Sequence, residues 1–356
     1  MVELAEVVEA LKGEPLWAAS SGARELFHSD MLQWLAKYEP EAFTEVFQLP
    51  AADEYCCERE RGHLDLWIAA RDGGRSIVVE NKLFSLPREA QLDGYSEKIA
   101  LRPAMAGCEQ VLLSLTSPDW PEGRYGPWAW MSYRVLGERL VDTFSSRSDF
   151  AGQFAWHWGR LCVLLDLLRS AVSVATLNEP YELEQAREPL PDARLAAFAH
   201  SVRAYQVGRM IRIGLGEESL VAVAVDFTRS KALIEAFCQA ADGIELGWQF
   251  QERQWRLAVR VAEGCEHDDR PCWGRGPAVA AERVRLVGER YPEHFRFDEL
   301  DELDIENNMA KTQRPYQHFA PGFTYQYRKV STATIGQIVA AGVATSRRIL
   351  RECSAD

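Results

Sequence analysis

The chain has 356 residues, of which 47% are hydrophobic and 26% are charged. This length suggests two domains, and the composition is that of a globular protein rather than a disordered one. The 40 basic and 53 acidic residues give a formal net charge of −13. Such a charge excludes a protein that coats nucleic acid through its overall charge, although it leaves room for a local basic patch.

The patterning argues against a membrane protein and against a secreted one. The most apolar run, residues 161–168, contains Asp166 and is flanked by Arg160 and Arg169, whereas a membrane span needs about 20 apolar residues. Residues 1–6 lack the basic and apolar regions of a secretory signal. The 8 cysteines are too sparse for a disulfide framework, so we expect no membrane association and a reducing, cytoplasmic location.

The first half of the chain contains both helical and strand patterns. Apolar residues three and four apart predict helices, and short apolar runs bounded by turn residues predict strands. The helices are predicted at residues 2–11, 24–36, 88–101, 138–144 and 150–175, and the strands at residues 54–60, 63–70, 75–83, 110–115 and 132–136. The turn sequence Asp72-Gly73-Gly74 joins the second and third strands, which predicts a hairpin.

Three prolines among glutamates mark residues 177–192 as a linker. This divides the chain into a first domain at residues 1–176 and a second at residues 193–356. The second half has predicted helices at residues 193–213, 230–241, 279–290 and 334–351, and predicted strands at residues 220–227, 244–250, 255–262 and 323–328. We therefore expect a mixed α+β accessory domain that serves substrate binding, recognition or oligomerisation.

Charged residues follow the apolar part of the predicted hairpin. Asp65 lies in its first strand, and Glu80 and Lys82 lie two residues apart in its second strand, so these two point to the same face. A charge at the end of a buried strand is costly unless it is paired or bound to a metal. Two neighbouring carboxylates repel each other, and a hard divalent cation removes that repulsion. The alternative is a surface Glu-Lys pair with an unrelated Asp65.

The context of these residues is more informative than the tripeptide itself. An acid-x-Lys tripeptide arises about once by chance in a chain of this composition. A strand that bears Asp65, a glycine-rich turn and an apolar strand that ends in Glu80-Asn81-Lys82 is a more specific pattern. This pattern resembles the signature of the PD-(D/E)XK phosphodiesterase superfamily. The resemblance implies an α/β (α+β) restriction-endonuclease-like core, with a central mixed sheet flanked by helices.

Further residues match in the order that this superfamily requires. Glu25, on the preceding helix, resembles the helical acidic residue of the family. Gln91 and Tyr95, on the following helix, resemble the Gln-x-x-x-Tyr motif of RecB-like nucleases. Leu64 stands where many members have proline before the first acid. The resemblance covers about residues 20–145 and points to an uncharacterised bacterial branch of the superfamily.

The resemblance implies a role for each of these residues. Asp65 and Glu80, with the backbone carbonyl of Asn81, would hold Mg²⁺ or Mn²⁺. Lys82 would position the attacking water and stabilise charge on the phosphorus centre. Glu25 would complete a second metal site or hold a metal-bound water, or it is simply a solvated helix acid.

Gln91 and Tyr95, one helical turn apart, would contact the scissile phosphate or brace Lys82. The alternative to a role at the active site is that Tyr95 is a core residue.

The expected function is that of a metal-dependent nuclease that hydrolyses phosphodiester bonds in DNA, in bacterial defence or in DNA processing. The expected partners are nucleic acid and either a second copy of the chain or a component of a defence system. The alternatives are a non-cleaving nucleic-acid-binding or regulatory module and an assembly component on the same fold. Six arginines are candidates for a basic wall, with solvated faces as the alternative: Arg59, Arg61, Arg88, Arg347, Arg348 and Arg351.

Other ligand-type residues give weaker signals. His28 is a candidate base, but a helix-packing role is favoured for it. His63 lies two residues before Asp65, and we favour a solvated or structural role at the start of the strand. Cys265, His267 and Cys272 hint at zinc, but their spacing matches no standard knuckle.

Overall fold

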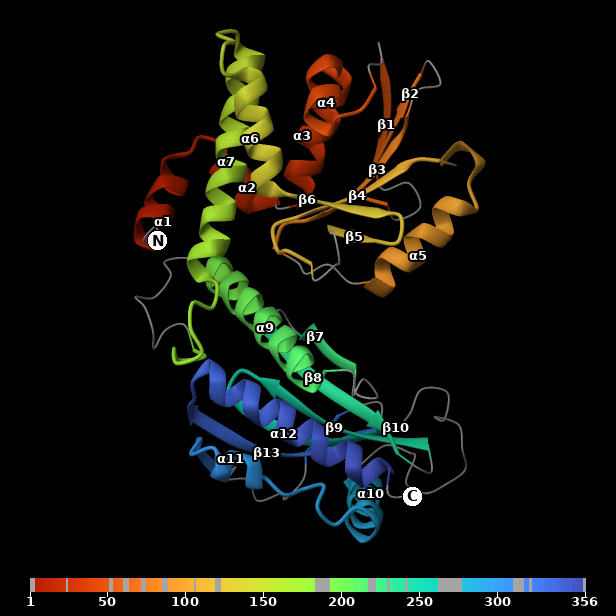
Figure 1. Ribbon diagram of the computed structural model, residues 1–356, viewed down its shortest axis with the longest axis vertical. Helices are drawn as coiled ribbons and strands as arrows, with labels where there is room; N and C mark the ends of the chain where they lie inside the picture. The colour runs from red at the N-terminus through yellow and green to blue at the C-terminus, as the bar shows by residue number, and fades with distance from the viewer. Residues whose placement is uncertain are drawn as a thin grey trace. The chain divides into compact units, whose positions relative to one another are not determined.

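The computed structural model describes residues 4–23, 25–50, 54–59, 64–71, 75–84, 89–105, 107–118, 123–182, 193–216, 222–228, 231–240, 243–261, 277–309, 317–319 and 322–354. The chain forms two compact units, Met1–Val172 and Ser173–Asp356. Each unit contains a β-sheet of its own, as Figure 1 shows.

The first unit is built on a six-stranded sheet in the order β1-β2-β3-β4-β6-β5. The strands are β1 (Tyr55–Arg59), β2 (Leu66–Ala70), β3 (Ile77–Lys82), β4 (Glu109–Ser114), β5 (Arg124–Tyr125) and β6 (Trp128–Ser132). Strands β1, β2 and β3 pair antiparallel, whereas β3, β4 and β6 pair parallel, so the sheet is mixed. The apolar run of β3 is buried because strands pair with it on both sides and helices cover both faces.

Helices cover this sheet on both faces (Figure 1). The helices of this unit are α1 (Leu4–Gly13), α2 (Trp17–Ala23), α3 (Glu25–Tyr38), α4 (Pro40–Phe47), α5 (Glu89–Ala100), α6 (Tyr133–Phe144) and α7 (Phe150–Val172). Helix α5 packs Leu92 and Ile99 against Val78 of β3. Helix α3 contacts β1, β2 and β3 on the other face, where Ser29 reaches Asn81. The residues of β3 therefore alternate between the α5 side and the α3 side.

The second unit is built on a seven-stranded sheet in the order β11-β13-β10-β9-β8-β7, with β12 paired to β13. Its strands are β7 (Ala222–Thr228), β8 (Lys231–Gln239), β9 (Ile244–Gln251), β10 (Gln254–Val261), β11 (Glu306–Met309), β12 (Gln317–Phe319) and β13 (Phe323–Thr332). Its helices are α9 (Ala193–Leu215), α10 (Pro277–Arg290), α11 (Asp298–Glu302) and α12 (Ile335–Ser354). One core joins Ile211 of α9, Ile338 of α12 and Trp248 of β9. Helices α9 and α12 thus cover one face of the sheet.

The predicted fold class is confirmed: a mixed sheet flanked by helices is followed by a second α+β domain. The hairpin is confirmed as the antiparallel pair β2–β3, although its turn at 72–74 lies outside the described residues. Residues 183–192 of the predicted linker also lie outside the described residues. Tyr181, from the described part of that segment, is buried against Phe250 in the core of the second unit. Among the described residues, no helix combines the length and the apolar character needed to cross a bilayer.

Two element predictions were wrong. Residues 230–241 were predicted as a helix, but β8 occupies Lys231–Gln239 and pairs with β7 and β9. Residues 132–136 were predicted as a strand, but the strand β6 ends at Ser132 and helix α6 starts at Tyr133. The hydroxyl of Ser132 caps this helix by accepting a hydrogen bond from the backbone N–H of Val135 at 3.1 Å.

Candidate active site

The hairpin register brings two carboxylates together. Leu66 pairs with Val79 in the antiparallel ladder, so Asp65, one residue before β2, lies opposite Glu80. Oδ2 of Asp65 accepts a hydrogen bond from the backbone N–H of Asn81 at 2.8 Å. The two acids are therefore held side by side by the backbone of the hairpin.

Glu80 is the most enclosed acid of the group. Its side chain is 1% exposed, and Nζ of Lys82 lies 2.8 Å from its Oε1. Nε2 of Gln91, on α5, donates to the same oxygen at 3.1 Å and to the hydroxyl of Tyr95 at 2.6 Å. The structure thus places Gln91 and Tyr95 on the same face as Glu80 and Lys82, and Gln91 contacts Glu80 rather than Lys82. Tyr95 is also buried in the core cluster on the α5 side of the sheet, which agrees with the alternative that it is a core residue.

The charges of this group are strongly coupled. Burial, followed by the neighbouring carboxylate of Asp65, raises the pKa of Glu80 to about 7. Burial also raises the pKa of Asp65, against the hydrogen bond from Asn81. Burial disfavours the charged form of Lys82, but the Glu80 carboxylate outweighs it and raises the pKa of Lys82. Two carboxylates share one ammonium, so the group has room for a further positive charge.

The donor chemistry fits a hard divalent cation. Oε2 of Glu80 is buried and has no hydrogen-bond partner among the described residues. A buried acceptor without a donor is costly, and carboxylate oxygens are the ligands that Mg²⁺ and Mn²⁺ prefer. Asp65 and Glu80 are the side chains that would hold such an ion, with the backbone carbonyl of Asn81 as the third ligand that we infer.

The side chain of Asn81 points to the other face of the sheet. Its Nδ2 donates to the backbone carbonyl of Glu25 at 2.9 Å and to Oγ of Ser29 at 3.2 Å. Its Oδ1 accepts a hydrogen bond of 2.6 Å from the fully buried hydroxyl of Tyr133. Asn81 therefore ties β3 to α3 and to the start of α6, which fixes the position of its neighbours Glu80 and Lys82.

Glu25 lies at the end of β3 rather than among the other acids. Its Oε1 accepts hydrogen bonds from the backbone N–H groups of Leu83 and Phe84, at 3.3 and 3.4 Å. It is close enough for its charge to add to the raised pKa of Asp65. Within the described ranges, no set of three or more His, Cys, Asp or Glu side chains converges on one metal position. Glu25 thus contacts the backbone at the end of β3, and its part in a second metal site stays a prediction.

His28 lies in the core. Trp158 donates its indole N–H to Nδ1 of His28 at 3.1 Å, so the ring proton sits on Nε2, which pairs with Oγ of Ser20 at 2.9 Å. Burial lowers the pKa of His28 to about 3. His28 is thus a neutral packing residue, as favoured. His63, Cys265, His267 and Cys272 lie outside the described residues.

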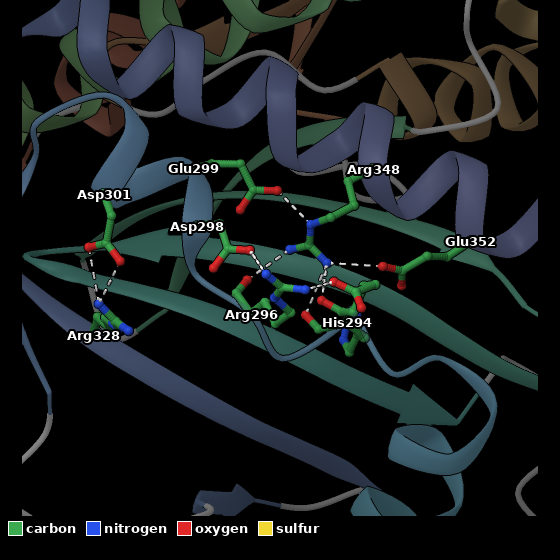
Figure 2. Close-up of polar contacts among 9 residues, drawn as sticks. His294, Arg296, Asp298, Glu299, Asp301, Arg328, Arg348 and Glu352 are labelled. Carbon is green, nitrogen blue, oxygen red and sulfur yellow. Dashed lines mark hydrogen bonds and ion pairs between the residues drawn. The ribbon is translucent and has the colours of Figure 1, made fainter.

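Arg348 does not fit the predicted group of arginines that would contact DNA, because carboxylates of the second unit already pair with it. Figure 2 shows its guanidinium between Glu299 and Glu352, where Nε lies 2.5 Å from Glu299 Oε1 and Nη1 lies 3.1 Å from Glu352 Oε1. Arg59 pairs with Asp30. Arg61 and Arg88 lie outside the described residues.

Sequence reasoning missed the contribution of Ser29 and Tyr133. Neither residue was predicted from the sequence to contact the site. A polar residue in the first turns of an apolar helix is the sequence feature that could have indicated such a residue. However, Asn81, to which both side chains bond, is more than fifty positions away from each of them in the sequence.

A comparison with known protein families matches the region that contains this site. A family model described as the PD-(D/E)XK nuclease superfamily matches residues 39–134. This span contains the whole sheet of the first unit, with Asp65, Glu80 and Lys82, and ends just after Tyr133. No curated protein matches the chain, and no solved structure matches it.

Proposed function

We propose that this chain, whose N-terminal unit belongs to the PD-(D/E)XK nuclease superfamily, is a metal-dependent nuclease that hydrolyses phosphodiester bonds in DNA. The observation that carries the proposal is the group in which the buried Glu80 lies beside the half-buried Asp65 and contacts Lys82. The restriction-endonuclease-like sheet positions all three at the end of one hairpin.

Each residue of the group has a role that follows from its contacts. Asp65 and Glu80 would hold Mg²⁺ or Mn²⁺, and the ion, when bound, activates water and neutralises charge on the phosphodiester. Lys82, whose ammonium is held by Glu80, donates hydrogen bonds that can orient a water or a phosphate oxygen. Gln91 donates to one oxygen of Glu80, so the other oxygen would be available to hold the cation. Tyr95 in turn holds the amide of Gln91.

The biological setting is proposed by analogy with the superfamily. We propose DNA as the substrate and bacterial defence or DNA processing as the role. The partners would then be DNA and either a second copy of the chain or a defence-system component. The sparse cysteines support a cytoplasmic location for this activity. The Gln-x-x-x-Tyr residues, Gln91 and Tyr95, are the basis for proposing a RecB-like variant of the site.

The test is cleavage by purified protein. Supercoiled, linear and single-stranded DNA, and RNA, are incubated with Mg²⁺, with Mn²⁺ and with EDTA. We expect metal-dependent cleavage of DNA that falls on the order of 100-fold or more in Asp65→Ala, Glu80→Ala and Lys82→Ala, because each substitution removes a charged group from the site. Glu109→Ala, at the start of β4 where the side chain is 37% exposed and pairs with Arg75, is the matched control and should cleave like the wild type.

Two outcomes would contradict the proposal. Equal cleavage by the wild type and the three variants would assign the activity to a contaminant. DNA binding without cleavage under every metal condition would favour the non-cleaving module instead.

A further inference from the structure

The sheet of the second unit has two faces of different chemistry. Trp255, Leu257 and Val259 of β10 point into the core beneath α9 and α12. Because side chains alternate along a strand, Arg256 and Arg260 point to the opposite side, here called the second face. A guanidinium in the middle of a sheet is unusual, since buried charges are normally paired.

Among the described residues, no carboxylate pairs closely with Arg256. It is 9% exposed, and no carboxylate of the described part of the chain lies within ion-pair distance of it. Its hydrogen bonds run to neutral amide oxygens, at 3.1 and 2.9 Å to Gln254 and 3.3 Å to Gln249. These three bonds leave two of the five guanidinium N–H groups without an acceptor among the described residues. Burial accordingly lowers the pKa of Arg256.

Arg203, the other buried arginine among the described residues, shows what a structural arginine in this unit looks like. It is 1% exposed, but it lies 3.6 Å from the carboxylate of Glu179 and donates to the carbonyls of Pro180 and Tyr181. Arg260, on the second face, pairs with Glu245. Arg256 differs from both, because no carboxylate of the described residues lies within ion-pair distance of it, and Glu252 acts on its charge only from further away.

The position of Arg256 is fixed in advance. Nε2 of Gln249 donates to Glu235 at 2.6 Å, which turns the carbonyl oxygen of that amide toward Arg256. The guanidinium lies 5.2 Å from the centre of the Tyr325 ring. Such pre-ordering lowers the entropy cost of binding a ligand anion.

Aromatic rings adjoin the guanidinium on the same face. Tyr327 is the cross-strand partner of Arg256, and Tyr325 is the partner of Ala258. The two tyrosine rings are 6.2 Å apart, both are half-buried, and Lys329 beyond them is exposed. A planar ligand can stack on such rings while its anionic group reaches the arginine.

We propose that the second face binds single-stranded nucleic acid, with a phosphate at Arg256 and neighbouring bases on Tyr325 and Tyr327. A strand of nucleic acid offers phosphates and flat bases at regular intervals, which is the combination of charge and aromatic surface found here. Lys329 would contact the next phosphate. This inference rests on the proposed function, because it gives the second unit the task of holding the substrate strand.

The test is the binding of fluorescently labelled dT20 by fluorescence anisotropy, in EDTA so that no cleavage occurs. We expect roughly 10-fold weaker binding for Arg256→Gln and for Tyr327→Leu, and a salt dependence of log Kd that is reduced by about one for Arg256→Gln. Arg285→Gln, an ion-paired exposed arginine of α10, is the control and should bind like the wild type. Circular dichroism and melting curves show whether each variant is folded, and Lys329→Gln provides a surface variant that leaves the Arg256 network intact.

Three outcomes would overturn the inference. The first is that the wild type does not bind dT20, and the second is that folded Arg256→Gln, Tyr327→Leu and Lys329→Gln bind dT20 as tightly as the wild type does. The third is that the mononucleotide dTMP binds to the wild type as tightly as dT20 does. The last result would assign the site to a free nucleotide. Binding that depends on Arg256 in a protein that never cleaves would contradict the proposed nuclease and leave this site standing. Cleavage that depends on Glu80 without any Arg256-dependent binding would contradict this site alone.

Discussion

At the scale of single residues, burial decides the charge of several titratable groups. His28 is fully buried between Ser20 and Trp158, and its pKa of about 3 keeps the ring neutral in the folded protein. In the unfolded chain the ring takes up a proton below its ordinary pKa of 6.5. The unfolded state therefore binds more protons between these values, and stability falls as the pH decreases through that window.

A pH-dependence prediction follows for His28. Replacing His28 by Gln removes this titration, so the loss of unfolding free energy between pH 7.5 and pH 5 should be smaller in His28→Gln than in the wild type, by about 2 kcal/mol. Urea unfolding at the two pH values measures the difference. An equal loss in both proteins would mean that His28 is already protonated, or exposed, in the folded state.

At the scale of elements, the contacts of Arg348 join α12 to the segment around α11. Its guanidinium lies between Glu299 and Glu352 and donates to the backbone carbonyls of Glu293 and Arg296, as Figure 2 shows in part. The side chains of Arg348 and Glu299 are 15% and 10% exposed. Removing one partner of so enclosed a pair leaves the other charges uncompensated.

We expect Arg348→Ala to destabilise the second unit by about 3 kcal/mol. Arg351→Ala, one turn further along α12 at an exposed position, should change stability by less than about 0.5 kcal/mol. Thermal and urea unfolding compare the two variants. A loss in Arg351→Ala as large as that in Arg348→Ala would show that helix propensity, and not the ion network, explains the effect.

The strand β8 shows why one element prediction failed. Leu233, Ile234 and Phe237 are spaced like the apolar face of a helix, yet the segment pairs with strands on both sides. Ile234 points into the main core, and Phe237 packs with Phe323 on the second face. A strand that is buried on both faces loses the alternation of apolar and polar residues, so its period does not distinguish it from a helix.

At the scale of the whole molecule, each unit has its own sheet and its own core. We therefore expect two unfolding transitions in calorimetry. Mn²⁺ should raise the transition temperature of the first unit by a few degrees, because a ligand that binds only the folded state stabilises it. Glu80→Gln should abolish this shift, and Arg348→Ala should lower only the other transition. A Mn²⁺ effect that persists in Glu80→Gln would place the metal elsewhere.

The hairpin, and the order of the two acids and the lysine along it, could be predicted from the sequence. These features are local: strand period places Glu80 and Lys82 on one face, and the antiparallel pairing of β2 with β3 places Asp65 opposite Glu80. The fold class followed from the same patterns and from the family resemblance, and the structure brings all three residues together. The helix-packing role favoured for His28 also followed from its position before an apolar run.

The partners that come from distant parts of the chain could be found only from the folded structure. Gln91 on Glu80, Tyr133 on Asn81, and the carboxylates around Arg348 depend on which helix covers which face of a sheet. The same holds for Arg256, whose lack of a carboxylate among the described residues is a property of four neighbouring strands. Sheet order and helix packing depend on the total apolar surface that all the elements bury together, and the spacing of residues within one segment does not determine that total.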